Sequence, residues 1–240
     1  MRILSWVRGL CLWTFWLVWT ALAWLVITLT WPFAPHGHFA GWWGRIWARG
    51  ILLSSGVRLT VDGRHNVRGG PFVVLGNHSS MLDIAVCYAA LPIQLRFVSR
   101  PFFFKVPFLG WGMWLARHVS MDPKRPREAA AVLRSLDRRF RRGVSIVMFP
   151  EGTRSRDGQV QRYKRGPILL GVRSDVTLLP ICICGTFEAL PKGRFLPKPG
   201  RVRVVIGEPV PTSGVDPGDA RRLASEIEAW TRAAKSEPAS

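Results

Sequence analysis

Residues 72–86 read FVVLGNHSSMLDIAV: a short apolar run, a turn that carries Asn77, His78 and Asp83, and a second apolar run. The first run has the length and composition of a buried strand, and the second begins like a helix. A strand that leads through a turn into a helix is the repeating unit of an α/β layer fold. We therefore expect His78 at a strand-to-helix turn, where substrates can reach its side chain.

The sequence on both sides of this stretch continues the alternation of strand-like and helix-like runs. Apolar periodicity, a proline at the start and a glycine at the end predict a helix over residues 126–142, and a second periodic run predicts one over 218–235. The remaining β-rich runs predict strands at residues 57–61, 72–75, 95–98, 144–149, 176–183 and 202–206. The pattern indicates the α/β class.

The amino-terminal part has a different composition, because residues 10–31 contain no charged side chain. At about 1.5 Å per residue, a helix of this length matches roughly the thickness of a bilayer core. A cleaved signal peptide fits less well, since the run is long and no small-residue cleavage site follows it. A second apolar stretch, 39–55, carries Arg45 and Arg49. We expect residues 1–55 to attach the chain to a membrane, with a hairpin that enters one leaflet favoured over a single span.

The chain combines 48% hydrophobic residues with a formal net charge of +19, so an anionic partner is expected. That partner could be nucleic acid, an anionic bilayer or a phosphate-bearing substrate. Nucleic acid is disfavoured, because most tryptophans lie in or beside the apolar segment rather than among basic residues. The four cysteines form neither a zinc motif nor a disulfide framework, and Cys182 and Cys184 are expected to pack in the core.

His78 and Asp83 are candidates for proton transfer. Five positions on one ideal helix would place two side chains about 140° apart. The two can meet only if His78 precedes the helix and Asp83 bends back toward it. A carboxylate on one imidazole nitrogen leaves the other nitrogen free to take a proton from an alcohol. The alternative is that His78 caps the helix and Asp83 is a surface acid.

A second cluster, FPEGTRS at residues 149–155, directly follows another predicted strand. Gly152 allows the backbone to approach a ligand closely, Thr153 and Ser155 offer hydroxyl groups, and Arg154 can hold a phosphate with two parallel hydrogen bonds. The cluster predicts an anion-binding turn, with a capped turn that binds no ligand as the alternative.

The two clusters together resemble a known family. Asn77, His78 and Asp83 match the NHxxxxD motif, and residues 149–155 match the FPEGTRS motif, of the glycerolipid acyltransferases typified by 1-acylglycerol-3-phosphate acyltransferase. Their order and their separation of roughly seventy residues are also similar. Weaker blocks at 98–110, 163–166 and 179–181 agree, and the resemblance covers about residues 57–211. It implies a single mixed-sheet acyltransferase domain over residues 56–235, with helices packed around the sheet and a loose tail at 236–240.

The resemblance also implies roles for individual residues. His78 would be the catalytic base and Asp83 its orienting partner, and no metal or cofactor would take part. A fatty acyl group would move from acyl-CoA or acyl carrier protein to the free hydroxyl of 1-acyl-sn-glycerol-3-phosphate, which gives phosphatidic acid. The residues that would bind the acceptor are Glu151, Gly152, Thr153 and Arg154, with Lys105 as a further candidate.

One departure from the family pattern concerns the acceptor site. Where the family normally has an arginine, this chain has Pro123, and Lys124 or Arg125 would supply the positive charge from a shifted position. Another lyso-lipid acceptor therefore stays open as an alternative. A non-catalytic lipid-binding protein is a separate alternative, against which the presence of both His78 and Asp83 argues. Anionic membrane lipids are expected partners, and the resemblance places the catalytic domain on the cytoplasmic face of a bacterial inner membrane.

Overall fold

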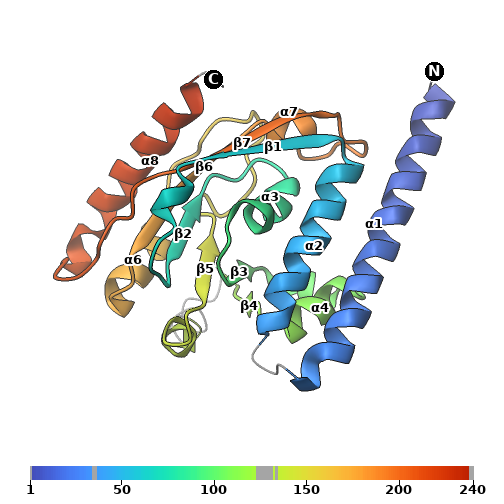
Figure 1. The fold of residues 1–240 in the computed structure, drawn as a ribbon. Helices are drawn as coiled ribbons and strands as arrows, with labels where there is room; N and C mark the ends of the chain where they lie inside the picture. The colour runs from blue at the N-terminus through green and yellow to red at the C-terminus, as the bar shows by residue number, and fades with distance from the viewer. Residues whose placement is uncertain (1, 34–36, 123–131, 133–134, 238–240) are drawn as a thin grey trace.

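The protein is described by a computed structural model that covers residues 2–33, 37–122, 132 and 135–237. Its centre is a seven-stranded sheet in the order β1-β7-β6-β2-β5-β3-β4 (Figure 1). The strands are β1 (Val57–Asp62), β2 (Val73–Gly76), β3 (Leu95–Ser99), β4 (Val119–Ser120), β5 (Ser145–Met148), β6 (Leu178–Cys184) and β7 (Gly200–Ile206).

The sheet is mixed, as expected, because β6 and β7 pair antiparallel while every other pair of neighbouring strands is parallel. Strand β2 lies between β5 and β6, with Leu75 opposite both Met148 and Pro180. Since these three strands are parallel, their carboxyl ends meet at one edge of the sheet. The turns that follow β2 and β5 carry the two sequence motifs.

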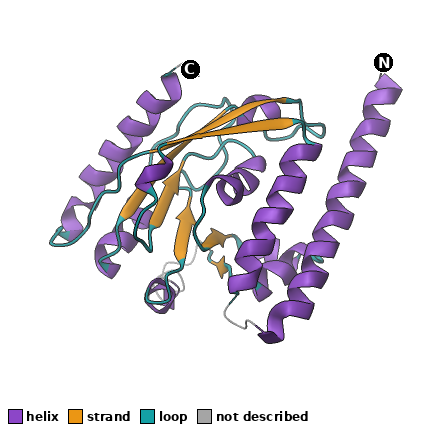
Figure 2. Cartoon of the chain, in the orientation of Figure 1, coloured by secondary structure: helices purple, strands orange, loops and turns teal. Residues whose placement is uncertain are grey.

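Helices cover both faces of the sheet (Figure 2). Alternate residues of each strand point to opposite faces, so Val73 and Leu75 join one core cluster and Val74 joins the other. The Val74 side packs against α2 (His38–Ser54) and α3 (Leu82–Ala90). The opposite side packs against α6 (Arg165–Ser174), α8 (Ala220–Ser236) and the helical residues 132 and 135–140.

The predicted strands agree with the structure to within two residues at each end. The helix predicted at 218–235 is α8, and Gly143 ends the helix predicted at 126–142 with a φ of 71°. Most of residues 126–134 lie outside the described residues. The two-residue strand β4 and the helices α4 (Leu109–Leu115), α6 and α7 (Thr186–Ala189) were not predicted from the sequence. These helices are short, and α4 and α6 contain glycine or proline, so their helical signal is weak.

Helix α1 (Arg2–Thr30) and α2 form an antiparallel pair (Figure 1). The first helix begins at Arg2, well before residue 10, because the absence of charge marks membrane suitability and does not mark a helix boundary. Indole groups join the two helices. Trp16 Nε1 donates to Ser54 Oγ at 3.0 Å, Trp19 Nε1 donates to the Trp47 carbonyl at 3.0 Å, and Trp16 is part of the same core as the sheet.

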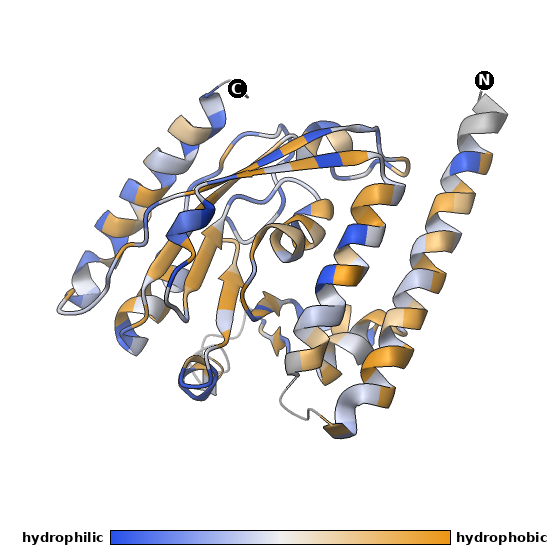
Figure 3. Cartoon of the chain, in the orientation of Figure 1, coloured by the Kyte–Doolittle hydropathy of each residue, from blue (hydrophilic) through white to orange (hydrophobic). Residues whose placement is uncertain are grey.

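The outward face of α1 is apolar and exposed. Residues Trp6–Phe33 form the one helix, within the described part of the chain, that is long and apolar enough to cross a membrane by length and composition. Leu10, Leu17 and Leu29 on this helix are 65%, 58% and 63% exposed. Figure 3 shows the predominance of apolar and weakly polar residues along α1. This surface suggests that the chain associates with a membrane.

Candidate active site

Asn77, the residue after β2, fixes the entrance to the site. Its side-chain Nδ2 donates to the Ile183 carbonyl at 2.9 Å, and its Oδ1 accepts from the Ile183 amide at 2.7 Å. The side chain therefore imitates a strand residue and extends the pairing of β2 with β6. Because Asn77 is 1% exposed, these two bonds hold the backbone immediately before His78 in a single position.

His78 and Asp83 meet directly, with His78 Nδ1 2.7 Å from Asp83 Oδ2. His78 precedes α3, and Asp83 lies in the first turn of that helix. The Asp83 side chain bends back over the helix start, where its Oδ2 also accepts hydrogen bonds from the backbone amides of Ser79 at 2.8 Å and Ser80 at 2.9 Å. This is the arrangement expected from their spacing, and it excludes Asp83 as a surface acid.

The pair is asymmetric in its exposure. The Asp83 side chain is completely buried, whereas the His78 side chain is 18% exposed. With Nδ1 donating to the carboxylate, Nε2 is the nitrogen with a free lone pair, and no residue in the described part of the chain hydrogen-bonds to it. The imidazole can therefore accept a proton from a molecule that approaches from solvent.

The turn formed by residues 149–155 wraps around His78. Glu151 Oε1 accepts from the His78 amide at 2.8 Å, and the Ser155 amide donates to the His78 carbonyl at 2.8 Å. Phe149 stacks on the imidazole, with ring centroids 4.1 Å apart and ring planes 12° apart. Parallel pairing of β2 with β5 brings the two motifs together, although they are far apart in sequence.

The structure gives Glu151 a place different from the expected one. Its side chain is 3% exposed, and both carboxylate oxygens accept backbone amides, from His78 and, at 3.3 Å, from Gln161. Burial is the main cause that raises the pKa of Glu151 to about 7, with the charge of Asp83 contributing in the same direction. Glu151 is therefore positioned to hold the His78 backbone rather than to face a ligand.

Ser155 likewise faces inward. It is 1% exposed, and its hydroxyl donates to Asp157 Oδ1 at 2.8 Å, so the expectation that this hydroxyl binds a ligand is not met. Thr153 is exposed, and Arg154 is partly exposed. The outward part of the turn therefore consists of Gly152, Thr153 and Arg154.

Basic side chains surround Gly152. Arg100 Nη2 donates to the Gly152 carbonyl at 3.2 Å, and a Cβ atom added to Gly152 would lie 2.7 Å from Lys164 Nζ. Gly152 has a φ of 73°, a conformation that favours glycine. Arg100, Arg154 and Lys164 thus place positive charge around an exposed stretch of backbone, which is suited to an anion.

The other basic residues expected at the acceptor site are not seen beside Gly152 in the described part of the chain. Lys105 ends the 3₁₀ helix η3 (Pro101–Lys105) and is exposed, and Arg100 is the residue of this segment that reaches the turn. Lys124 and Arg125 lie outside the described residues. Arg100 and Lys164 were not expected as site residues. Both lie in sequence blocks that resemble the family, and this location could have indicated them from the sequence.

No group of three or more His, Cys, Asp and Glu side chains that could hold a metal ion is found among the residues that the structure describes. The site contains an oriented imidazole, a buried carboxylate and a cationic turn. Such a site can deprotonate a hydroxyl group while it binds a nearby anion.

A model of the acyltransferase family matches residues 58–184, which include both motif turns, β2 to β6 and all of β1 except Val57. The chain belongs to the acyltransferase family.

Several curated acyltransferases are similar to this chain. A chloroplastic 1-acyl-sn-glycerol-3-phosphate acyltransferase of Arabidopsis thaliana is 30% identical over 177 residues, which are 72% of this chain and 49% of the relative. The 1-acyl-sn-glycerol-3-phosphate acyltransferase of Pseudomonas aeruginosa is 29% identical over 217 residues, 89% of this chain and 82% of the relative. The chain spans about half the length of the first curated relatives that it matches.

A solved acyltransferase structure has the same fold. The crystal structure of the 1-acyl-sn-glycerophosphate (LPA) acyltransferase PlsC from Thermotoga maritima superposes with a TM-score of 0.83 and covers 100% of this chain and 99% of that chain, at 23% sequence identity. The agreement extends over the full length, so it includes the α1–α2 pair as well as the sheet.

Proposed function

We propose that this acyltransferase transfers a fatty acyl group from a thioester carrier to the free hydroxyl of a lysophospholipid, with His78 as the general base. The contact of 2.7 Å between His78 Nδ1 and the buried Asp83 carboxylate carries the proposal. It orients the imidazole so that Nε2 faces the substrate, and general-base help of this kind accelerates a reaction by roughly 10² to 10⁴.

The reaction proceeds by direct attack. His78 Nε2 accepts the proton of the acceptor hydroxyl while the hydroxyl oxygen attacks the thioester carbonyl. The new oxygen–carbon bond forms an ester, the carbon–sulfur bond breaks, and the proton leaves with the thiol of the carrier. Asp83 stabilises the imidazolium that forms in between, as a carboxylate does beside a catalytic histidine. No metal or cofactor takes part in this proposed sequence.

The cationic turn holds the phosphate of the acceptor. Arg154 can bind two phosphate oxygens at once, and Arg100 and Lys164 add positive charge on either side of Gly152. Because this turn is hydrogen-bonded to the His78 backbone at Glu151 and Ser155, a bound phosphate and the imidazole keep a fixed separation. Glu151 acts in this scheme as a positioning residue.

Lysophosphatidic acid is the acceptor that fits best, and phosphatidic acid is then the product. Relatives with 29% and 30% identity carry the name 1-acyl-sn-glycerol-3-phosphate acyltransferase, and both motifs that define the site are present here. Acyl-CoA and acyl carrier protein are the two candidate donors, since each carries its acyl group as a thioester.

An apolar cavity of about 480 Å³ between α1 and α4 gives the lipid a contact outside the reaction centre. Trp24, Phe104, Trp111 and Trp114 are among its lining residues, and none of the motif residues lines it. Acyl chains partition into apolar clefts of this kind. We assign the cavity to a hydrocarbon chain and the reaction to the turns at His78 and Gly152.

The packing of α1 supports a proposal about how the chain sits in the membrane. Near its amino-terminal end Trp6 contacts Phe195 with ring centroids 5.7 Å apart, and near its carboxyl-terminal end Trp24 contacts Trp111 with ring centroids 5.4 Å apart. Both ends thus lie against the same folded unit, which favours a helix that enters one leaflet over one that spans the bilayer. We propose that the chain lies on the cytoplasmic face of a bacterial inner membrane.

A panel of donors against acceptors tests the function. Purified full-length chain would be given radiolabelled acyl-CoA or acyl carrier protein with lysophosphatidic acid, other lysophospholipids or glycerol 3-phosphate. We expect labelled phosphatidic acid, and we expect His78→Ala to reduce its formation by roughly 10² or more while membrane binding is kept. If His78→Ala turned over as fast as wild type, His78 would not be the general base. If other acceptors were acylated and lysophosphatidic acid was not, lysophosphatidic acid would not be the substrate.

A further inference from the structure

Two cysteines on β6 form a close thiol pair that the proposed reaction does not use. Cys182 and Cys184 are separated by one residue on a strand, so both side chains lie on the same face, and their Sγ atoms are 3.6 Å apart. Cys182 is buried, and Cys184 is half-buried. Core packing, the expectation from sequence, holds for Cys182, which is completely buried, whereas Cys184 is partly open to solvent.

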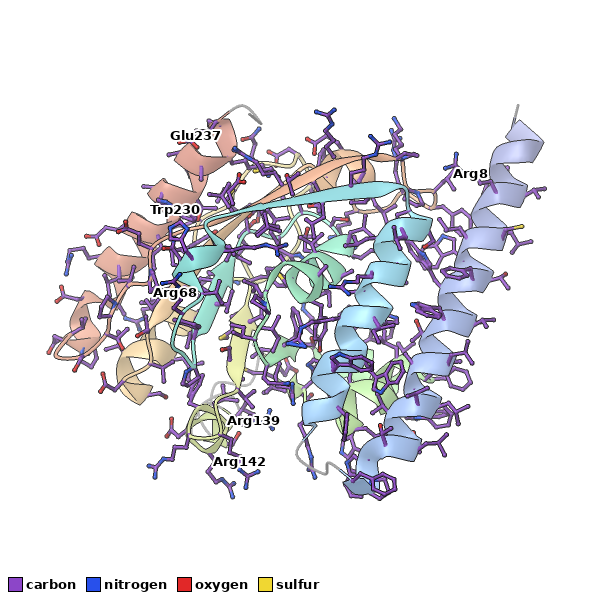
Figure 4. All side chains as sticks on the ribbon, in the orientation of Figure 1. Arg8, Arg68, Arg139, Arg142, Trp230 and Glu237 are labelled. Atoms are coloured by element: carbon purple, nitrogen blue, oxygen red, sulfur yellow. The ribbon has the colours of Figure 1, made fainter. Side chains whose placement is uncertain are left out.

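The surroundings make the two thiols unequal. Cys182 Sγ lies 3.4 Å from the Thr231 carbonyl of α8, beneath the helix. Cys184 lies opposite Arg203 of β7, and Arg203 Nη2 donates to the Glu237 carbonyl at 2.9 Å at the end of α8. Figure 4 shows α8 beside the sheet, with Trp230 along the helix and Glu237 at its carboxyl-terminal end.

These surroundings also favour a thiolate at Cys184. The contact with Cys182 is the main cause that lowers the pKa of Cys184; burial acts against it, and the positive charges of Lys235 and Arg203 act with it. The pKa of Cys182 is raised, by the same contact and by burial. A partly exposed thiolate beside a buried thiol is the arrangement of a nucleophile and a resolving cysteine.

The residue between the two cysteines connects the pair to the active site. Ile183 is the residue that forms both hydrogen bonds with the Asn77 side chain, at 2.7 and 2.9 Å, and Asn77 directly precedes His78. A change in the backbone of Ile183 therefore acts on the peptide that positions the imidazole.

We propose that Cys182 and Cys184 are a modification site, a dithiol that hydroperoxides oxidise to an intramolecular disulfide, and that this oxidation lowers acyl transfer. The effect on transfer rests on the function proposed above, whereas the oxidation itself does not.

The oxidation takes two balanced steps. The Cys184 thiolate attacks one peroxide oxygen, the oxygen–oxygen bond breaks, and after protonation Cys184 sulfenic acid and one water are formed. The Cys182 sulfur then attacks the sulfenic sulfur, and a second water leaves with the Cys182 proton. Hydrogen peroxide is reduced to two waters, and the two thiols are oxidised by two electrons in total.

The disulfide requires the strand to bend at Ile183. Two Cβ atoms in a disulfide lie about 3.8 Å apart. Residues i and i+2 of an extended strand lie about 6.6 Å apart along the strand, and their side chains leave it on the same face, so their Cβ atoms are too far apart for a disulfide. Closing the pair therefore pulls the flanks of Ile183 together and rotates its amide and carbonyl groups away from Asn77. A displacement of about 1 Å at a catalytic group can cost up to roughly 10² in rate.

The test uses reduced full-length protein in lipid vesicles, treated with hydrogen peroxide. Non-reducing peptide mass analysis should find the peptide that contains both cysteines lighter by two hydrogen atoms. Acyl transfer should fall by roughly tenfold and return after dithiothreitol is added. Cys182→Ala and Cys184→Ala should each prevent the disulfide and the reversible loss. Cys11→Ala removes an exposed cysteine from α1 and should leave the response unchanged.

Two results would overturn the proposal. The first is a peroxide-treated chain in which the two cysteines remain thiols or are only overoxidised at Cys184. The second is complete conversion to the disulfide with unchanged transfer. A reduced wild-type chain that transfers no acyl group would instead contradict the proposed function, and the mass analysis would still decide the chemistry of the thiols.

Discussion

At the scale of single residues, the site depends on three hydrogen bonds that one carboxylate oxygen of Asp83 accepts. This oxygen, Oδ2, accepts from His78 Nδ1 and from the backbone amides of Ser79 and Ser80, so the carboxylate is held by the turn that leads into α3. Charge-assisted bonds of this kind are stronger than neutral ones. The orientation of the imidazole is therefore built into the local backbone and does not depend on a flexible loop.

Arg154 is the residue that tests the phosphate assignment. Hydrogen bonds to a charged partner contribute about 1.5 to 3 kcal/mol, so Arg154→Ala should raise the KM for lysophosphatidic acid roughly 10-fold to 100-fold with a smaller change in kcat. Steady-state kinetics with the acceptor varied measures this. Arg58→Ala removes an equal charge from the exposed edge strand β1 and should leave that KM unchanged. An unaltered KM in Arg154→Ala would remove Arg154 from the phosphate site.

The raised pKa of Glu151 should make the free energy of unfolding depend on pH. Its pKa is about 7 in the folded chain, against an ordinary value of 4.5, so folding favours the protonated carboxyl. The stabilisation it contributes is fully present below about pH 4.5 and is lost as the pH rises through about 7. Urea unfolding of wild type and Glu151→Gln between those values measures it.

Glu151→Gln keeps an oxygen for the His78 amide and cannot ionise. Its free energy of unfolding should therefore decline less than that of wild type as the pH rises. Parallel pH profiles for the two proteins would show that the Glu151 carboxyl does not titrate in this range.

At the scale of elements, the α1–α2 pair is held by close contact between indoles and small residues. Gly50 on α2 faces the ring of Trp19 on α1, whose Nε1 donates to the Trp47 carbonyl. Trp47 Nε1 in turn donates to Thr20 Oγ1 at 3.0 Å. Tryptophan pairs its indole N–H in this way when it is buried, and here the bonds cross between the helices. The two helices therefore act as one unit against the sheet.

Substitution of Gly50 tests this packing. A Cβ atom at Gly50 would lie 2.6 Å from Trp19 Cε2, so Gly50→Ala should reduce the free energy of unfolding by about 1 to 3 kcal/mol. Chemical unfolding in detergent micelles, followed by tryptophan fluorescence, is the measurement. Gly112→Ala on α4 is the matched control, because the nearest atom to its added Cβ is Trp24 Cβ at 3.9 Å. Equal stability of Gly50→Ala and wild type would contradict the observed closeness of the helices.

At the scale of the whole molecule, strong positive charge is combined with an exposed apolar surface. The chain carries a formal net charge of +19, while exposed aromatic residues lie on η3 and on α4, the helix that contacts α1 through Trp24 and Trp111. Phe102 is 69% exposed and Trp114 is 64% exposed. An apolar patch of this kind in a basic protein favours insertion into an anionic interface. The product of the proposed reaction is itself an anionic lipid.

Membrane binding should therefore depend on both lipid charge and salt. Each basic residue near an anionic surface contributes about 1 kcal/mol, and this attraction is screened within roughly 10 Å at 0.1 M salt. Vesicle co-sedimentation should show binding to phosphatidylglycerol-containing vesicles that weakens by tenfold or more, roughly, between about 0.05 and 0.5 M salt. Purely zwitterionic vesicles should bind more weakly and without this salt dependence. Equal binding to both kinds of vesicle at low salt would assign attachment to the apolar surface alone.

Local sequence patterns were enough to predict six of the seven strands in the described residues, the two longest helices of the amino-terminal part and the two motifs. Strand runs and uncharged helices are recognisable because their apolar residues follow a local period, and His78 and Asp83 meet because their geometry is set within six consecutive residues. The anion-binding character of Gly152 and Arg154 was also readable, since it depends on residue type.

The orientation of the side chains in this turn, outward to solvent or inward to the His78 backbone, became visible in the folded chain alone. Glu151 turned inward to the His78 amide, Arg100 replaced Lys105 beside Gly152, and the Cys182–Cys184 pair was joined through Ile183 to Asn77. Each of these contacts depends on the order and register of β3, β5, β2 and β6, which bring residues about fifty to a hundred positions apart into hydrogen-bonding distance. Strand order follows from long-range packing of the whole sheet, and a local sequence pattern contains no information about it.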